Sequence, residues 1–292
     1  MSVALQGSIS QGILWGIMVL GVFITFRLLD IPDMTVDGSF ALGGSVVAVL
    51  IVNAHVHPAV AILAGMVAGG LAGAITGVLT TVFEIPAILA GILTQISLWS
   101  INLRIMGKSN TPLLANDTIF SDASKLTGLP QSTVSALMGI IIAIVIVAVL
   151  YWFFGTEIGS ALRATGNNED MIRALGVNTN RTKMIALVLS NALVGLAGGL
   201  ICQSQKYADI GMGTGAIVIG LAAIVIGARL TAAVVGSVVY FLIRAFVLQM
   251  GMDANDMKLL SAVIVVLALC IPVVWEKYKL RSSYSRGDDQ DA

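Results

Sequence analysis

Long apolar stretches separated by short polar breaks run along almost the whole chain. A helix needs about 20 apolar residues to cross the hydrocarbon core of a bilayer, and these stretches have roughly that length. The pattern therefore predicts an all-α polytopic membrane protein, with residues 1–292 forming a single transmembrane domain. We expect about nine spans, near residues 11–29, 38–54, 58–83, 86–106, 133–154, 183–205, 213–229, 232–250 and 257–275.

Composition agrees with this interpretation. The chain is 57% hydrophobic and 11% charged, whereas a soluble domain carries roughly 25% charged residues. The N-terminal residues MSVALQGSISQG lack a basic region and a small-residue cleavage site, so we expect the first apolar stretch to be a retained span and not a signal peptide. A soluble protein is excluded, because it would have no place for so much apolar surface.

The distribution of lysine and arginine predicts the orientation, because short loops rich in these residues stay in the cytoplasm. A cytoplasmic C-terminus and an outside N-terminus fit the bias, with nine spans between them. Lys108, Lys125, Lys206, Lys258 and Arg104 then face outward. The inward set is larger: Arg27, Arg163, Arg173, Arg181, Lys183, Arg229, Lys277, Lys279, Arg281 and Arg286.

Nine spans can be divided into four, one and four, and the single fifth span would invert the second set relative to the first. Such an inverted repeat is common in transporters. The second span begins with DMTVDGSFALGG (33–44), and its counterpart, the seventh, begins with DIGMGTGAIVIG (209–220). Paired glycine-rich stretches indicate discontinuous helices that line a pathway, although two ordinary polar loop ends would look the same. Thr35, Asp37 and Ser39 are candidate pathway residues in the first stretch.

Glycine also recurs at every fourth position of the third span, at Gly65, Gly69, Gly73 and Gly77, and therefore forms one row on a helix face. Small residues at this spacing allow two membrane helices to approach until their backbones touch. The row favours a contact within one bundle, with a subunit interface as the alternative.

Polar groups inside predicted spans are costly and therefore informative. Gln95 and Asn102 are seven residues apart and share a face of the fourth span, and Asn191 lies in the sixth. They suit either hydrogen bonds between helices or a weakly binding pathway. Arg244 lies deep in the eighth span, where it either snorkels, forms an internal ion pair or draws an anionic group into the pathway.

Motifs for catalysis are missing from the sequence. It contains no phosphate-binding G-x-x-x-x-G-K-[ST], no H-E-x-x-H, no G-x-S-x-G and no Cys/His cluster with metal spacing. We therefore expect no catalytic residue, no metal site and no cofactor bound by this chain.

Two polar segments are longer than turns. Residues 107–132 form the longest outward loop, which we expect to be an ordered surface loop without a core of its own, serving as a docking surface or as a spacer. Residues 155–182 instead fit two short amphipathic helices separated by GNN at 166–168, with charged residues on the polar faces. A short helix across the cytoplasmic mouth can be pushed by a moving partner and transmit that push to the adjacent spans.

The second segment, GSALRATGNNEDMIRALGV, resembles the permease subunits of bacterial ABC importers of the branched-chain amino acid and ribose group. The helix that follows, with SNALVGLAGGL (190–200), the stretch DMTVDGSFALGG and the late IGLAAIVIGARLTAAVVGSVVY (219–240) resemble the same family, so the resemblance covers essentially the whole chain. The compact size and SINLRIMGKSN (100–110) are most similar to permeases for tryptophan or tyrosine.

The resemblance implies a permease, as a homodimer in the bacterial cytoplasmic membrane, that imports a small solute such as an amino acid, with aromatic ones as candidates. Its partners would be two cytoplasmic ATPase subunits, which bind ATP and Mg, and an extracytoplasmic solute-binding protein; no nucleic acid is expected. Residues 157–177 would couple the ATPase to the spans through Glu157, Arg163, Ala164, Gly166, Asn167, Asn168, Arg173, Ala174 and Gly176. The alternatives are a secondary transporter driven by an ion gradient and, less supported because it lacks a catalytic cluster, a membrane-embedded enzyme.

Overall fold

The computed structural model describes residues 2–114, 116–226 and 230–249, together with the isolated positions 259, 262, 263, 266 and 270. Most of the predicted ninth span, 257–275, lies outside the described residues, and so do Arg229, Lys258 and the lysines and arginines from 277 onward. The orientation inferred from those charges therefore stays a prediction.

Helices coincide with the other eight predicted spans. Six helical segments of the described chain are long and apolar enough to cross a membrane, and two apolar helices are shorter. The spans correspond to α1 (Ser2–Val22) continued by a π-helix, η1 (Phe23–Leu28), and to α2 (Val36–Val52), α3 (Pro58–Thr81), α4 (Ala87–Met106), α6 (Gln131–Gly155), α9 (Thr179–Gln205), α10 (Ala216–Ile226) and α11 (Leu230–Gln249).

The two short helices are the ones with glycine-rich beginnings. At 17 and 11 residues, α2 and α10 fall below the roughly 20 needed for a full crossing. A non-helical stretch precedes α2, and a strand and a 3₁₀ turn precede α10. These features agree with helices that begin inside the protein and not at its surface.

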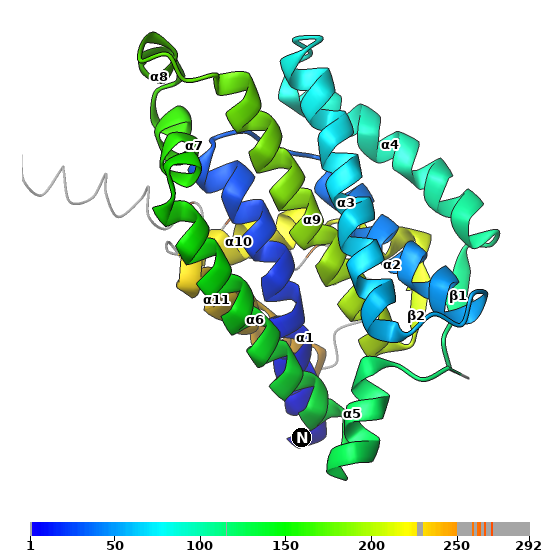
Figure 1. The fold of residues 1–292 in the computed structure, drawn as a ribbon. Helices are drawn as coiled ribbons and strands as arrows, with labels where there is room; N and C mark the ends of the chain where they lie inside the picture. Colours follow the sequence, from blue (N-terminus) through cyan, green and yellow to red (C-terminus); the bar gives the residue numbers. More distant parts are fainter. Residues whose placement is uncertain are drawn as a thin grey trace, which may run out of the picture.

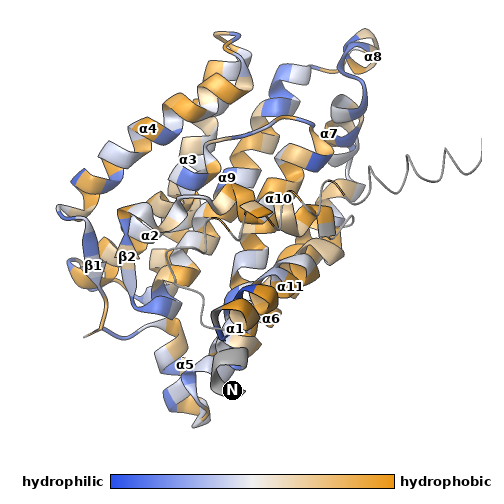
Figure 2. Ribbon diagram, turned by 180° about the vertical axis from the view of Figure 1, so that it is seen from behind, coloured by the Kyte–Doolittle hydropathy of each residue, from blue (hydrophilic) through white to orange (hydrophobic). Residues whose placement is uncertain are grey.

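The centre of the bundle is formed by α1 and α9, which Figure 1 shows between the other long helices. Both are mostly buried within the chain, whereas α4 and α6 leave most of their apolar residues exposed. In Figure 2 hydrophobic residues recur along the whole of α4, with polar ones between them. This inside-out pattern is expected of a bundle surrounded by lipid or by another membrane chain.

The glycine row of α3 packs inside the bundle, against α9. A Cβ added at Gly69 or at Gly73 would overlap a backbone oxygen of α9, that of Asn191 or that of Leu187. Gly195 of α9 faces the row, because a Cβ there would lie 3.0 Å from the Cα of Gly69. The predicted contact within one bundle is therefore confirmed for this row.

The segment 107–132 is more structured than the sequence suggested. It contains a strand, β1 (Asn110–Pro112), which pairs antiparallel with β2 (Tyr207–Asp209), and a helix, α5 (Ile119–Thr127). Phe120 of α5 is fully buried in the main core of the bundle, so the segment packs on the bundle and has no core of its own. The two strands also mean that the chain is mostly helical and not entirely α.

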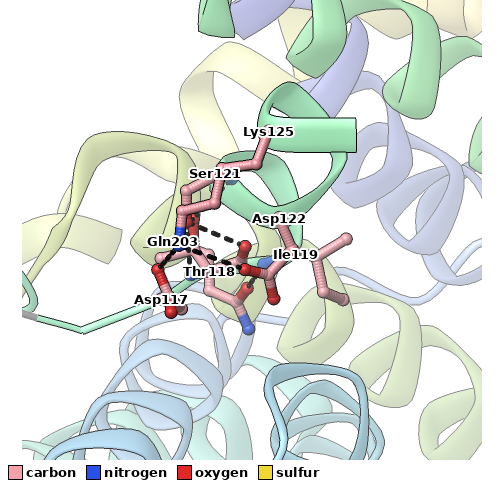
Figure 3. Close-up of polar contacts among 7 residues, drawn as sticks. All are labelled: Asp117, Thr118, Ile119, Ser121, Asp122, Lys125 and Gln203. Carbon is pink, nitrogen blue, oxygen red and sulfur yellow. Dashed lines mark hydrogen bonds and ion pairs between the residues drawn. The ribbon is translucent and has the colours of Figure 1, made fainter. Parts of the chain in front are cut away.

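A glutamine of α9 attaches the beginning of α5 to the bundle, as Figure 3 shows. Gln203 near the end of α9 accepts a hydrogen bond from the N–H of Ile119 and donates one to the carbonyl of Pro58, each over 3.0 Å. Thr118 and Ser121 form a capping box at the start of α5, and Lys125 is ion-paired with Asp117. Gln203 thus fixes the beginnings of α5 and α3 to one position on α9.

Candidate functional site

The predicted coupling segment forms two short helices, α7 (Glu157–Asn167) and α8 (Glu169–Ala174), at the end of the bundle opposite α5 (Figure 1). Thr156 starts α7: its hydroxyl donates to the carbonyl of Phe153 over 2.6 Å and accepts from the N–H of Gly159 over 3.3 Å. The prediction of two helices is confirmed. The break between them falls at Asn168, however, and Gly166 lies within α7, so the chain does not bend at that glycine.

Gly166 has a different role, which is close contact with the end of the first span. A Cβ at this position would overlap the carbonyl oxygen of Leu28 and lie 2.8 Å from the Cα of Leu29. Only glycine therefore lets α7 rest directly on the backbone that follows η1. The contact is a rigid one, because neither side can yield by changing a side-chain rotamer.

Further contacts attach α7 to the C-terminal end of α6. Arg163 donates from Nη2 to the carbonyl of Phe154 over 2.8 Å, and Leu162 is fully buried. A Cβ at Gly159 would overlap the carbonyl of Phe153. The helix α7 thus contacts three elements of the bundle, α6, η1 and α9.

Hydrogen bonds and ion pairs attach α8 to the start of α9. Asn168 caps α8 by accepting from the N–H of Met171 over 3.0 Å. Glu169 pairs with Lys183 over 2.6 Å and with Arg173 over 3.0 Å, and Arg173 donates to the hydroxyl of Thr179 over 3.1 Å. The Lys183 ammonium hydrogen-bonded to Glu169 lowers the pKa of that carboxyl below its ordinary value of 4.5.

A polar hollow of about 640 Å³ lies between α8, the beginning of α9 and the turn that joins α3 to α4. Glu84 borders it from that turn, and Glu169, Asp170, Arg173 and Lys183 border it from α8 and α9. The turn after α3 and the coupling segment therefore present one continuous charged surface.

The outer face of α7 and α8 is apolar as well as charged. Ile158, Met171 and Leu175 are 52%, 57% and 68% exposed, although their neighbours Leu162 and Ile172 are buried. Exposed apolar side chains rimmed by charges are typical of a protein-binding surface. Seven of the nine predicted coupling residues are exposed, and the other two, Ala164 and Gly166, are half-buried. The exposed ones are Glu157, Arg163, Asn167, Asn168, Arg173, Ala174 and Gly176.

The predicted pathway residues do not gather at one place. Thr35 directly precedes α2 and is fully buried; its hydroxyl lies 2.7 Å from that of Thr76 in α3, which donates to Thr94 of α4 over 3.0 Å. This chain of hydroxyl groups ties three helices together. Ser39 is fully buried one turn further along α2.

Asp37 joins the two short helices. Its carboxylate oxygens accept hydrogen bonds from the N–H groups of Gly215 and Ile217, each over 2.9 Å, at the beginning of α10. A Cβ at Gly213 would overlap the carbonyl of Asp37 itself. A carboxylate on free N–H groups stabilises a helix N-terminus, so the beginnings of α2 and α10 are held against each other inside the protein.

Gln95 and Asn102 lie together as predicted, beside this junction. Both border a small hollow of about 20 Å³ that Asp37 and Thr214 also line. The amide nitrogen of Asn102 donates to the carbonyl of Gly38 over 3.4 Å, and its amide oxygen has no partner among the described residues. Arg244 lines a separate, larger hollow, where its guanidinium lies 5.6 Å from the centre of the Phe241 ring.

Asn191 is buried on α9 and bonds to a residue that sequence reasoning did not select. Its Nδ2 donates to Asp33 over 2.7 Å and to the carbonyl of Leu187 over 3.0 Å. Asp33, only 3% exposed, also accepts from the N–H of Thr35 over 2.9 Å. The signal was present, because Asp33 begins the glycine-rich stretch 33–44; Thr76 and Thr94 carried no comparable signal.

The chain is similar to known transport permeases over most of its length. Residues 4–269 match the family described as branched-chain amino acid transport system / permease component. A tyrosine transport system permease protein of Clostridioides difficile is 38% identical over 88% of this chain and 87% of its own length. A ribose import permease protein of Escherichia coli is 29% identical over 87% of this chain and 81% of its own. No solved structure matches the chain significantly.

The match spans nearly all of the described helices, including the coupling segment, and it confirms the resemblance seen in the sequence. Permeases of this kind are membrane components of transport systems and are not enzymes, and the long apolar helices agree with a multi-pass protein of the bacterial cytoplasmic membrane. The chain belongs to the branched-chain amino acid transport permease family.

Proposed function

We propose that this chain is the membrane-spanning subunit of an ATP-driven importer. It receives a small solute, an amino acid with aromatic ones as candidates, from an extracytoplasmic solute-binding protein and passes it to the cytoplasm. Two partner ATPase subunits bind ATP and Mg and supply the energy. The tyrosine and ribose permeases among its relatives support the transport role, and the first supports the amino acid.

The observation that carries the proposal is the structure of α7 and α8. Their outer face exposes Ile158, Met171 and Leu175 beside charged groups, whereas their inner face touches the bundle through the backbone at Gly166. A partner that binds the outer face would therefore move the end of the first span directly. This is the arrangement that coupling requires, because a ligand shifts a conformational equilibrium only through contacts that differ between the states.

The same proposal places α7 and α8 in the cytoplasm and α5 outside. Leu114, Leu126 and Leu129 are exposed near α5, and they offer apolar contacts to a solute-binding protein. With α5 outside, the first four spans run from an outside N-terminus, and a ninth span brings the C-terminus inside.

Helix contacts support the 4+1+4 inverted repeat. In such a repeat α1 corresponds to α9 and α3 to α11, so the α3–α9 contact should have a counterpart between α11 and α1. It does: Cβ atoms at Gly12 and Gly16 would lie 2.8 and 3.3 Å from the Cα atoms of Val238 and Val234. The contact of α2 with α10 at Asp37 then lies on the pseudo-two-fold axis, where transporters place their pathway.

A second copy of the chain completes the proposal. Exposed apolar residues recur along one face of α3, and they continue over α4. A homodimer would enclose one pathway between its copies, with Thr35, Asp37, Ser39, Gln95, Asn102, Asn191 and Arg244 as the polar residues nearest to it.

The rival function, a secondary transporter, gains one observation from the structure. Asp33 is a buried carboxylic acid with no cation in ion-pair distance among the described residues, and such a group suits proton coupling. Uptake by the chain alone in vesicles, driven by a proton or sodium gradient, would establish this rival.

The test of the importer uses the chain and its cognate ATPase. The purified chain should hydrolyse no ATP, and it should form a stable complex with that ATPase. Replacing Met171 and Leu175 by Asp should reduce ATPase co-purification by about tenfold or more, because it places charges in an apolar contact. Leu126→Asp is the matched control, since Leu126 is 87% exposed on α5 at the other end. Equal recovery of ATPase with both proteins would overturn the assignment of the docking face.

A further inference from the structure

A hollow of about 650 Å³ lies among α1, α9, α10 and α11, beside the segment that precedes α10. Its volume is within the range of small-molecule sites, which is roughly 300–1,000 Å³. The residues that decide its chemistry are Arg244, Asp209, Trp15, Tyr207, Tyr240 and Gln205. One cation, one anion and three aromatic rings thus border the same space.

The two charged groups form no ion pair with each other, although Arg244 lies against the ring of Phe241. Among the described residues, neither Arg244 nor Asp209 forms an ion pair. Asp209 accepts a hydrogen bond from the N–H of Gly211 over 2.8 Å, which orients its carboxylate and leaves one oxygen available. Arg244 lies within the apolar helix α11, and a charged side chain in a membrane-spanning segment is costly and commonly serves a pathway or a ligand.

The beginning of α10 also borders the hollow, at Thr214 and Gly215, but it does not compete with Arg244 for an anion. The Asp37 carboxylate already accepts from the N–H groups of Gly215 and Ile217. A ligand carboxylate in this hollow therefore has one strong partner, the guanidinium of Arg244.

The apolar part of the hollow has fixed walls. Trp15 is 8% exposed, with its ring 4.9 Å from that of Phe40 and 5.6 Å from that of Phe241. Tyr240 is 1% exposed, whereas Tyr207 is 41% exposed. Rings held by other rings offer a ready surface to an apolar or aromatic side chain without an ordering cost.

We propose that this hollow binds the zwitterion of a free amino acid with an apolar or aromatic side chain. Arg244 holds the α-carboxylate, Asp209 holds the α-ammonium group, and the rings of Trp15 and Tyr240 contact the side chain. A neutral sugar would leave both charges without partners, and a ligand with a single charge would leave one. The proposal deepens the proposed function and rests on it, because it makes the permease itself recognise the amino acid.

The test uses the full chain in lipid nanodiscs, without ATPase or binding protein, and radiolabelled L-tyrosine as the probe. Saturable binding should be displaced by L-leucine but not by ribose. Tyrosinamide, which lacks the carboxylate, and N-acetyltyrosine, which lacks the ammonium group, should each compete at least about tenfold more weakly than L-tyrosine. Equal competition by L-tyrosine, tyrosinamide and N-acetyltyrosine would overturn the proposal, and this experiment requires no variant of the protein.

Variants then assign the two ends of the ligand. Arg244→Gln should weaken tyrosine binding at least about tenfold, and Arg244→Lys should weaken it less, because the positive charge remains. Asp209→Asn should act like Arg244→Gln. The matched controls are Arg104→Gln at the end of α4 and Asp122→Asn on α5, which lie outside the hollow and should bind normally.

Uptake by the assembled importer separates failure of this inference from failure of the proposed function. ATP-dependent uptake of L-tyrosine or L-leucine with no binding by the permease alone, and with normal uptake in Arg244→Gln, would overturn the hollow as a binding site and leave the importer standing. Absence of any ATP-dependent uptake of amino acids by the wild-type assembly would overturn the proposed function.

Discussion

The α3–α9 contact and the α7–η1 contact both depend on glycine residues that lie against backbone oxygens, but they differ in what surrounds them. The first lies deep in the bundle, where a row of glycines in α3 faces Gly195 of α9. The second involves a single glycine, Gly166, which lies against Leu28 at the end of the bundle. Gly166 belongs to α7, whose other face is exposed. The same kind of close contact therefore holds the fold together in one region, and in the other we expect it to transmit motion.

The difference follows from the number of contacts. Several glycines along α3 make its separation from α9 costly, because every turn of the interface would lose close packing. The α7–η1 contact involves one close approach, at Gly166, and the hydrogen bond from Arg163 to Phe154 attaches α7 to α6 beside it. We expect this contact to be rigid, because it joins two backbones, and weaker in total than the α3–α9 contact, because it is a single one.

The largest expected effect is at the deep contact. Gly73→Leu should prevent assembly of the bundle, at a cost of about 3 kcal/mol or more, because its first carbon would already overlap the carbonyl of Leu187. Gly73→Ala should be destabilising in the same direction. Gly70→Ala is the matched control: its Cβ would meet Ala192 at an ordinary 3.5 Å. The measurement is the yield and thermal stability of detergent-solubilised protein, and equal behaviour of the two alanine variants would mean that α3 and α9 do not touch through Gly73.

The next effect should be on transport and not on assembly. Gly166→Val should lower uptake by the assembled importer at least about tenfold, because its side chain must push α7 away from Leu28. Arg163→Glu should act in the same direction by losing the bond to Phe154. Gly155→Val is the matched control, since a Cβ at position 155 meets nothing within 4 Å.

Uptake in vesicles is measured beside the yield of folded permease and of co-purified ATPase. Normal uptake in both Gly166→Val and Arg163→Glu would show that α7 does not carry the motion. Loss of folded protein in Gly166→Val, with Arg163→Glu unaffected, would show instead that the α7–η1 contact belongs to the fold as the α3–α9 contact does.

The smallest effect concerns the ion pairs that attach α8 to α9. Lys183 lowers the pKa of Glu169, so the pair adds stability above the ordinary value of 4.5 and loses it as the pH falls through the lowered pKa of the folded state. Glu169→Gln should therefore lower the free energy of unfolding at pH 7 by at most about 1 kcal/mol. The melting temperature should fall slightly. The difference from wild type should disappear at strongly acid pH. Asp170→Asn, at the exposed neighbouring position, should show no such pH dependence.

Much of this protein could be predicted from the sequence, because a helix must be apolar over about 20 residues to cross a bilayer. Apolar length placed eight helices, the glycine spacing of α3 predicted the contact with another helix of the bundle, and the amphipathic pattern of 155–182 predicted two short helices. For 107–132 the sequence predicted an ordered segment without a core of its own but not its strand or its helix, since the burial of Phe120 and the pairing of β1 with β2 depend on residues about a hundred positions away.

By itself the sequence determined the membrane class, the long helices and the two short amphipathic helices of 155–182, because each depends on residue type and spacing along one element. Only the tertiary structure decided which polar residues meet. It placed Asp37 at the beginning of α10, Asp33 beside Asn191, and Gly166 on Leu28. These contacts join elements that are distant in sequence, and the positions of their backbones follow from the packing of the whole bundle, which no local pattern records.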